Sequence, residues 1–154
     1  MIKVFLDTNV ILDHALNWAF ADEAEKIFAM AEENEISCII STGSLYTLAY
    51  ILEKATKDIN VVREKLLLYL TFITPISNLP FDIEQAICDK TFNDIEDAFQ
   101  YYTALQARCD FFITANTKDF KKGEQVKLPV LSPDNYLLRY SWIKNQILRG
   151  NVGL

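Results

Sequence analysis

The chain has few of the residues that interrupt or cross-link a fold: four Gly, four Pro, three Cys and one His among 154 residues. So few Gly and Pro argue against long flexible linkers, and the sequence shows no internal repeat or low-complexity run. Cys38, Cys88 and Cys109 are widely spaced and match neither a disulfide framework nor a zinc pattern. We expect them to be small buried hydrophobes in a reduced, cytoplasmic protein.

Long apolar runs and an excess of basic charge are also absent. No stretch approaches the roughly 20 apolar residues of a membrane helix, and the first apolar run ends at Asp7, too early for a signal peptide. The formal net charge is −6, which argues against strong non-specific binding to nucleic acid, because a basic face supplies most of that affinity. A cluster of acids that binds cations would also make a chain acidic, and the bound metal would reverse the local charge.

Apolar residues, by contrast, are plentiful, at 51% of the chain, and they fall into short runs that alternate with amphipathic segments. We expect one domain over residues 1–154. Short continuous apolar runs predict buried strands at 2–6, 36–40, 73–76, 110–114 and 130–131. Helical spacing and capping residues predict helices at 10–18, 22–34, 42–57, 58–72, 82–90, 94–108 and from 133 onward. This alternation predicts a three-layer α/β/α fold with a mainly parallel central sheet.

Polar residues gather at the predicted edge where the parallel strands end, which is where such sheets bind ligands. One group follows the first strand, a second follows the fourth, and a third opens a helix that must lie at the same edge for the site to close. These groups are Asp7; Thr114, Asn116 and Asp119; and Asp94 and Asp97. Taken singly, each acid suits an ordinary helix cap or first turn. Together they predict a site for Mg²⁺ or Mn²⁺, because clustered carboxylates repel one another unless a cation lies between them.

A divalent cation in such a cluster can bind a phosphate oxygen, activate a water and stabilise a leaving oxygen. Thr8 and Asn9 could orient the acids or hold a metal-bound water. Phosphatases of the haloacid dehalogenase type and receiver domains also place Asp after the first strand. The former would need a second Asp where this chain has Asn9, and the latter an Asp after the third strand and a Lys after the last. Neither of these classes fits the residues as well as a metal site that acts on a phosphate group.

Four blocks, in their order along the chain, resemble those of the PIN-domain family. They are VFLDTNVILD at 4–13, DIEDAFQYYTA at 94–104, FITANTKDF at 112–120 and PVLSP at 129–133. The resemblance implies a metal-dependent endoribonuclease with RNA as its substrate. It also implies a VapC-like toxin of a toxin–antitoxin pair, usually a homodimer held inactive by a small antitoxin protein.

Carried over by position, the resemblance makes Asp7 and Asp97 metal ligands and Asp94 an additional acid beside them. Asn116 or Asp119 would fill the fourth polar position, and Thr114 would support it.

The chain departs from the family pattern at Thr47. The family usually carries a glutamate in the helix after the second strand, and Thr47 stands at that place. A threonine hydroxyl can hold a metal-bound water but adds no negative charge. Asp94 could replace that charge, whereas Glu53 lies on a different face of the helix. Alternatively, metal affinity has fallen and the protein is a catalytically weakened PIN-like module that binds RNA or a partner.

Two further groups have both a functional and an ordinary interpretation. Lys118, Lys121 and Lys122 follow the fourth strand and could contact an RNA backbone beside the acids, although they also suit a solvated loop. Tyr46 and Tyr50 lie one helical turn apart and could stack on unpaired bases. At this spacing they are more often core or subunit contacts.

Overall fold

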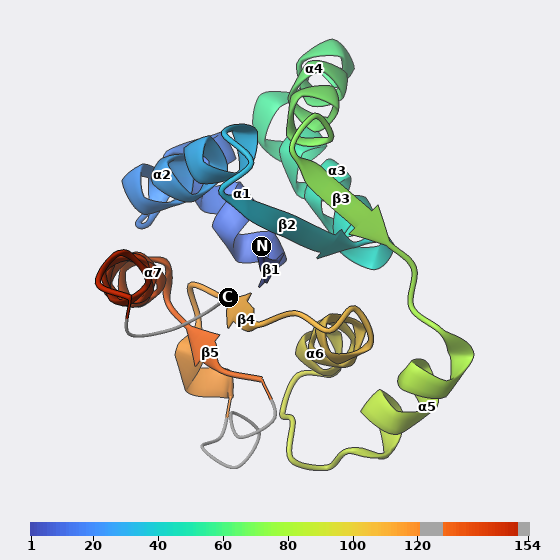
Figure 1. The fold of residues 1–154 in the computed structure, drawn as a ribbon. Coiled ribbons are helices and arrows are strands. Elements are labelled where there is room, and N and C mark those ends of the chain that lie inside the picture. The colour runs from blue at the N-terminus through green and yellow to red at the C-terminus, as the bar shows by residue number, and fades with distance from the viewer. Residues whose placement is uncertain (121–127, 151–154) are drawn as a thin grey trace.

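Five strands form one parallel sheet in the order β3-β2-β1-β4-β5 (Figure 1). The computed structural model describes residues 1–120 and 128–150, apart from the side chain of Asp119. The strands are β1 (Ile2–Leu6), β2 (Ile36–Ser41), β3 (Ile73–Ile76), β4 (Phe111–Ile113) and β5 (Val130–Leu131). The strands expected from short apolar runs are confirmed, with no end displaced by more than one residue.

The helices are α1 (Thr8–Leu16), α2 (Ala21–Glu32), α3 (Thr42–Thr56), α4 (Ile59–Tyr69), α5 (Pro80–Cys88), α6 (Ile95–Gln106) and α7 (Pro133–Leu148), with a short 3-10 helix η1 (Thr117–Asp119). Four of them begin at side chains that accept a backbone N–H of the first turn, namely Asp7, Ser41, Asp58 and Asp94. The predicted end of the first helix at 18 is wrong, because Asn17 adopts a left-handed conformation with φ 56° and terminates α1. In the described residues, no helix combines the length and apolar character needed to cross a membrane.

Alternation along the strands divides the core between the two faces of the sheet. β1 directs Val4 and Leu6 to one face and Phe5 to the other. Helices α1, α2, α3 and α7 cover the first face, whereas α6 covers the second and α5 packs against α6 (Figure 1). The strand β4 is buried on both faces and is wholly apolar in sequence, whereas the edge strand β3 leaves Thr74 and Pro75 exposed. The predicted three-layer α/β/α fold is confirmed.

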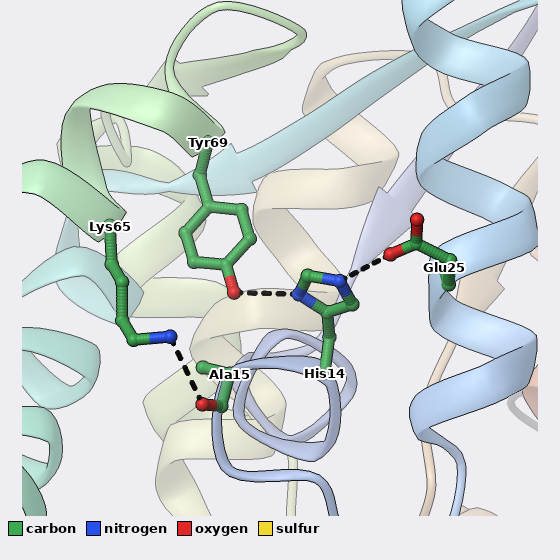
Figure 2. Close-up of polar contacts among 5 residues, drawn as sticks. All are labelled: His14, Ala15, Glu25, Lys65 and Tyr69. Atoms are coloured by element: carbon green, nitrogen blue, oxygen red, sulfur yellow. Dashed lines mark hydrogen bonds and ion pairs between the residues drawn. The ribbon is translucent and has the colours of Figure 1, made fainter.

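A polar cluster joins α1 to α2 and α4 (Figure 2). The His14 ring lies with Nδ1 2.8 Å from the Tyr69 hydroxyl and Nε2 2.5 Å from a carboxylate oxygen of Glu25. Burial and the nearby Glu25 raise the pKa of Tyr69 to about 12, so its phenol stays protonated and can donate to Nδ1. Lys65 Nζ donates to the carbonyl of Ala15 at 3.3 Å. These contacts give the single histidine a structural role.

One expectation for an individual side chain is wrong. Cys38 is buried and Cys109 half-buried, but Cys88 is exposed and is therefore no core residue. Tyr46 and Tyr50 are 79% and 63% exposed, so of the two predicted roles, core or subunit contact, they do not fill the first and the second stays a prediction.

Candidate active site

A pocket of 230 Å³ opens at the carboxyl end of β1, between α1, α3 and α6. We call it the acidic pocket. Six of the residues predicted from sequence line it: Asp7, Thr8, Asn9, Thr47, Asp94 and Asp97. Four further residues complete the lining: Leu12, Ile51, Glu96 and Gln100. Side chains far apart in sequence therefore converge, since the end of β1, the second and third turns of α3 and the start of α6 face one space.

Asp7 is the most buried acid of this pocket, with 2% of its surface exposed. Its Oδ2 accepts hydrogen bonds from the Thr114 hydroxyl at 2.6 Å and from Asn9 Nδ2 at 3.3 Å. Its backbone N–H donates to the carbonyl of Ile113 at 2.9 Å, which fixes the end of β1 against β4. Burial raises the pKa of Asp7, and hydrogen bonds from Thr114, Gln100 and Asn9 oppose that shift only in part. The fold thus holds a carboxylate where its charge is costly, and a bound cation would relieve that cost.

Thr114 supports Asp7 from the end of β4. Its side chain is fully buried, and its hydroxyl accepts the backbone N–H of Asn116 at 3.0 Å while donating to Asp7. Asn116 is exposed, its backbone N–H is joined to Asp7 through the Thr114 hydroxyl, and it does not line the acidic pocket. The side chain of Asp119 lies outside the described part of the chain, as do Lys121 and Lys122.

Thr114→Val should destabilise the protein by about 1.5–3 kcal/mol, because it leaves a buried carboxylate without its shortest hydrogen bond. Thr114→Ser keeps the hydroxyl and serves as the control. The free energy of unfolding in urea, measured without metal, checks this expectation. Equal stability of the valine and serine variants would show that the hydroxyl does not support Asp7.

The α6 wall carries three acids with different surroundings. Asp94 is exposed and caps α6 by accepting the Glu96 N–H at 2.7 Å, so its ordinary capping role and its place in the pocket coexist. Asp97 is half-buried. The hydroxyl of Thr47 donates to Oε1 of Glu96 at 3.2 Å, which bridges α3 to α6. The acid beside Thr47 is therefore Glu96, which sequence reasoning did not select.

Gln100 is the second residue that sequence reasoning missed. It lies one helical turn after Glu96, is 3% exposed, and accepts the backbone N–H of Thr8 at 3.4 Å. The hydrogen bond that it gives Asp7 lowers the pKa of that carboxyl. A glutamine on the buried face of an amphipathic helix is the signal that could have identified it, because buried polar side chains need partners.

The oxygen donors of the acidic pocket suit a hard divalent cation. Its ten lining residues offer carboxylate, hydroxyl and amide oxygens, and none of the ten carries a thiol, an imidazole or a positive charge. Over residues 1–120 and 128–150, no three Asp, Glu, His or Cys side chains lie close enough to hold one ion together. An ion in this pocket could also use its hydroxyl and amide oxygens and the waters that Mg²⁺ usually keeps.

Solved structures share this fold at low sequence identity. One is VapBC2 from Rickettsia felis bound to a promoter DNA fragment. It is 16% identical, the match covers 85% of this chain and 98% of that chain, and the TM-score is 0.67. A toxin–antitoxin complex from Klebsiella pneumoniae is 22% identical over 84% and 97% of the two chains, with a TM-score of 0.62. The Sarcin-Ricin loop cleaving toxin VapC20 from Mycobacterium tuberculosis is 14% identical over 71% and 86%, with a TM-score of 0.57. At such identities the likeness establishes the fold.

The family follows from the sequence. No curated protein matches the chain. The family model described as the PIN domain matches residues 3–118, a range that contains all ten residues of the acidic pocket together with Thr114. The chain belongs to the PIN-domain family, as its ordered acidic blocks predict.

Proposed function

We propose that the protein is a divalent-metal-dependent endoribonuclease of the VapC-like kind. The observation that carries this proposal is the buried carboxylate of Asp7 in a pocket whose facing wall presents Asp94, Glu96 and Asp97. Without a cation, four carboxylates would repel a phosphodiester from the pocket. The same four could hold a cation that binds the phosphodiester, so the charge of the site supports a metal-dependent reaction.

The side chains of the pocket have distinct parts in this reaction. Asp7 and Asp97 are the ligands, with Asp94 a further acid at the rim. Thr114 and Asn9 hold the Asp7 carboxylate in one orientation through hydrogen bonds to Oδ2. When bound, Mg²⁺ or Mn²⁺ would supply a water that ionises near neutral pH and a positive charge beside the leaving oxygen. Asn116 or Asp119 would fill the fourth polar position of the site, and Thr114 would support it.

Glu96 supplies the negative charge that Thr47 lacks in this proposal. The two side chains are joined by a hydrogen bond, and both line the acidic pocket. The carboxylate of Glu96 therefore occupies the side of the pocket next to α3, although it comes from α6. Glu96 on α6 thus supplies the negative charge that a glutamate at position 47 of α3 would have supplied, and the total charge of the acidic pocket stays the same.

We extend the proposal to partners by analogy with the structural relatives. Two of them were solved as VapBC2 and as a toxin–antitoxin complex, which supports a small antitoxin protein as a partner of this chain. The name of VapC20 as a Sarcin-Ricin loop cleaving toxin supports RNA as the substrate class. The exposed Tyr46 and Tyr50 on α3 offer apolar surface for a homodimer. We also propose a single domain over 1–154 and a cytoplasmic location.

A binding module without catalysis is the second candidate. Two observations favour it: Thr47 in place of an acid, and the lack of a preformed group of three ligands among the described residues. In that case the fold would contact RNA or a partner while the acidic pocket binds metal weakly.

RNA cleavage in Mn²⁺ or Mg²⁺, compared with cleavage in excess EDTA, decides between these two functions. The proposed enzyme cuts single-stranded RNA internally, stops in EDTA and recovers when metal is added back. Calorimetry of Mn²⁺ binding to the same preparation gives a readout independent of activity. Metal-independent cleavage, or no Mn²⁺ binding at millimolar concentration, would reject the proposal.

A further inference from the structure

A second pocket, of 190 Å³, lies directly beside the acidic pocket. We call it the side pocket. The two share three lining residues, Thr47, Glu96 and Gln100, and the hydrogen bond from Thr47 to Glu96 forms the common wall. Whatever occupies the side pocket is therefore next to the acids.

We propose that the side pocket binds one unpaired nucleobase of the RNA, adjacent to the phosphodiester at the acids. This rests on the proposed function, because it assigns the base specificity of that same site.

The size and walls of the side pocket fit one planar, mainly apolar group. Its volume is below the roughly 300–1,000 Å³ of pockets that enclose drug-sized ligands, which restricts the occupant to a small one. Its surface is mostly apolar, with Phe99 from α6 and Ile83 from α5 on its walls. Unpaired bases are commonly recognised by stacking on aromatic and apolar side chains, because every base has a flat π-face.

A buried pair of serines adds hydroxyl groups to the wall of the side pocket. Ser41 and Ser44 are 3% and 2% exposed, and both line the side pocket. Their hydroxyl oxygens lie 2.7 Å apart, and Ser41 Oγ also accepts the Ser44 N–H at 2.9 Å. Two hydroxyls carry two hydrogens, and one hydrogen makes the bond between them. The other hydrogen is available to an acceptor on the occupant, such as a base carbonyl or ring nitrogen.

The charge of the side pocket favours a neutral base over a phosphate. None of its described lining residues is Lys, Arg or His, and Glu96 lies on the wall that it shares with the acidic pocket. A carboxylate repels a phosphate but accepts hydrogen bonds from the amino or imino groups of a base. The two pockets therefore divide a nucleotide between them by chemistry, with its phosphate at the acids and its base beside them.

Neutral nucleosides test this assignment without any metal or cleavage. Adenosine, guanosine, cytidine and uridine are titrated into the metal-free full chain while the backbone amide signals of Ser44, Thr47 and Phe99 are followed by NMR. We expect one nucleoside to shift these signals at millimolar concentration, and ribose to leave them unchanged. Ile83→Trp fills the pocket and should weaken the binding of that nucleoside by roughly 5- to 150-fold, the range measured for loss of one stacked base. Ile87→Trp, one turn along α5 at a residue that is 60% exposed and does not line the pocket, should change it by less than about twofold.

A second variant keeps the test independent of how well the tryptophan is tolerated. Ser44→Ala removes one hydroxyl with little change in volume and should weaken the binding of the same nucleoside by about 2- to 10-fold.

Cleavage of RNAs that differ at one base should show a preference that Ile83→Trp removes and Ile87→Trp keeps. Nucleoside binding without cleavage would leave the base pocket standing and reject the nuclease. Unchanged base preference in Ile83→Trp with no nucleoside shifts would overturn the base pocket alone. The base pocket would also be overturned if N-acetyl-leucine amide shifted these NMR signals and no nucleoside did. That result would assign the pocket to an apolar side chain of a protein partner.

Discussion

Asp7→Asn is expected to lower RNA cleavage by at least about 100-fold while the protein folds as stably as the wild type or more so. The catalytic loss follows because Asp7 is a proposed direct ligand, and removing even the outer partners of metal ligands costs about 10- to 100-fold. The stability gain follows because burial raises the pKa of Asp7. The folded protein therefore binds a proton at this site more readily than the unfolded chain does.

The sign of the pH effect distinguishes this explanation from a general structural change. As the pH rises above the ordinary carboxyl value of about 4 and through the raised pKa of Asp7, the wild type loses stability that Asp7→Asn keeps. In urea unfolding without metal, the variant should therefore be the more stable protein at neutral pH, and the difference should close in acid. Added Mn²⁺ should raise the melting temperature of the wild type only, because it binds the folded site.

Asp13→Asn is the matched control for Asp7→Asn. Asp13 is also a buried acid of α1, at 5% exposed, and burial likewise raises its pKa, but it does not line the acidic pocket. Its amide variant should share the change in stability and keep both cleavage and the response to Mn²⁺. An Asp7→Asn protein that cuts RNA as fast as the wild type would overturn the role given to this carboxylate.

Glu96→Gln should weaken Mn²⁺ binding by about 10- to 100-fold, and adding Thr47→Glu to the same protein should restore most of that loss. The first effect is expected because Glu96 supplies the charge on the side of the pocket next to α3. The second is expected because the hydrogen bond between these two side chains places them at the same spot, so a carboxylate at position 47 returns the charge. Calorimetry with Mn²⁺ measures both, and cleavage rates should follow the affinities.

Glu53→Gln controls for the loss of one negative charge. Glu53 is exposed on α3 and lies outside the acidic pocket, so its variant should bind Mn²⁺ within about twofold of the wild type. If the double variant binds Mn²⁺ no better than Glu96→Gln, the charge of Glu96 does not replace an acid at position 47.

Much of the fold could be predicted because short apolar runs and helix caps are local signals. The strands appear as predicted, and Asp94 caps α6 where the sequence places it. The ends of α1 and α4 were less predictable. Asn17 adopts a left-handed conformation and ends α1. The apolar Leu70 and Phe72 suggest a longer α4, but the helix ends at Tyr69 because the chain turns there, with the Phe72 N–H bonded to the Tyr69 carbonyl.

The candidate site was predictable where a residue directly follows a strand. Asp7 and Thr114 end neighbouring strands, so parallel pairing brings them together, and their hydrogen bond bears this out. Glu96 and Gln100 were not predicted as site residues. Their place in the acidic pocket depends on how α6 is rotated against α3, and no local sequence signal reports that rotation. The backbone N–H of Asn116 donates to the Thr114 hydroxyl, and the prediction that Asn116 or Asp119 fills the fourth polar position stays a prediction.

The central place of β1 has a consequence for how the site is lost. β1 pairs with β2 on one side and β4 on the other, and the Asp7 N–H continues the ladder to Ile113. Partial opening of the outer strands, β3 and β5, leaves both neighbours of β1 in place. Amide hydrogen exchange at Asp7 should therefore occur only when the whole domain unfolds. Mild heat or denaturant should leave the Asp7 carboxylate in the acidic pocket until the domain unfolds.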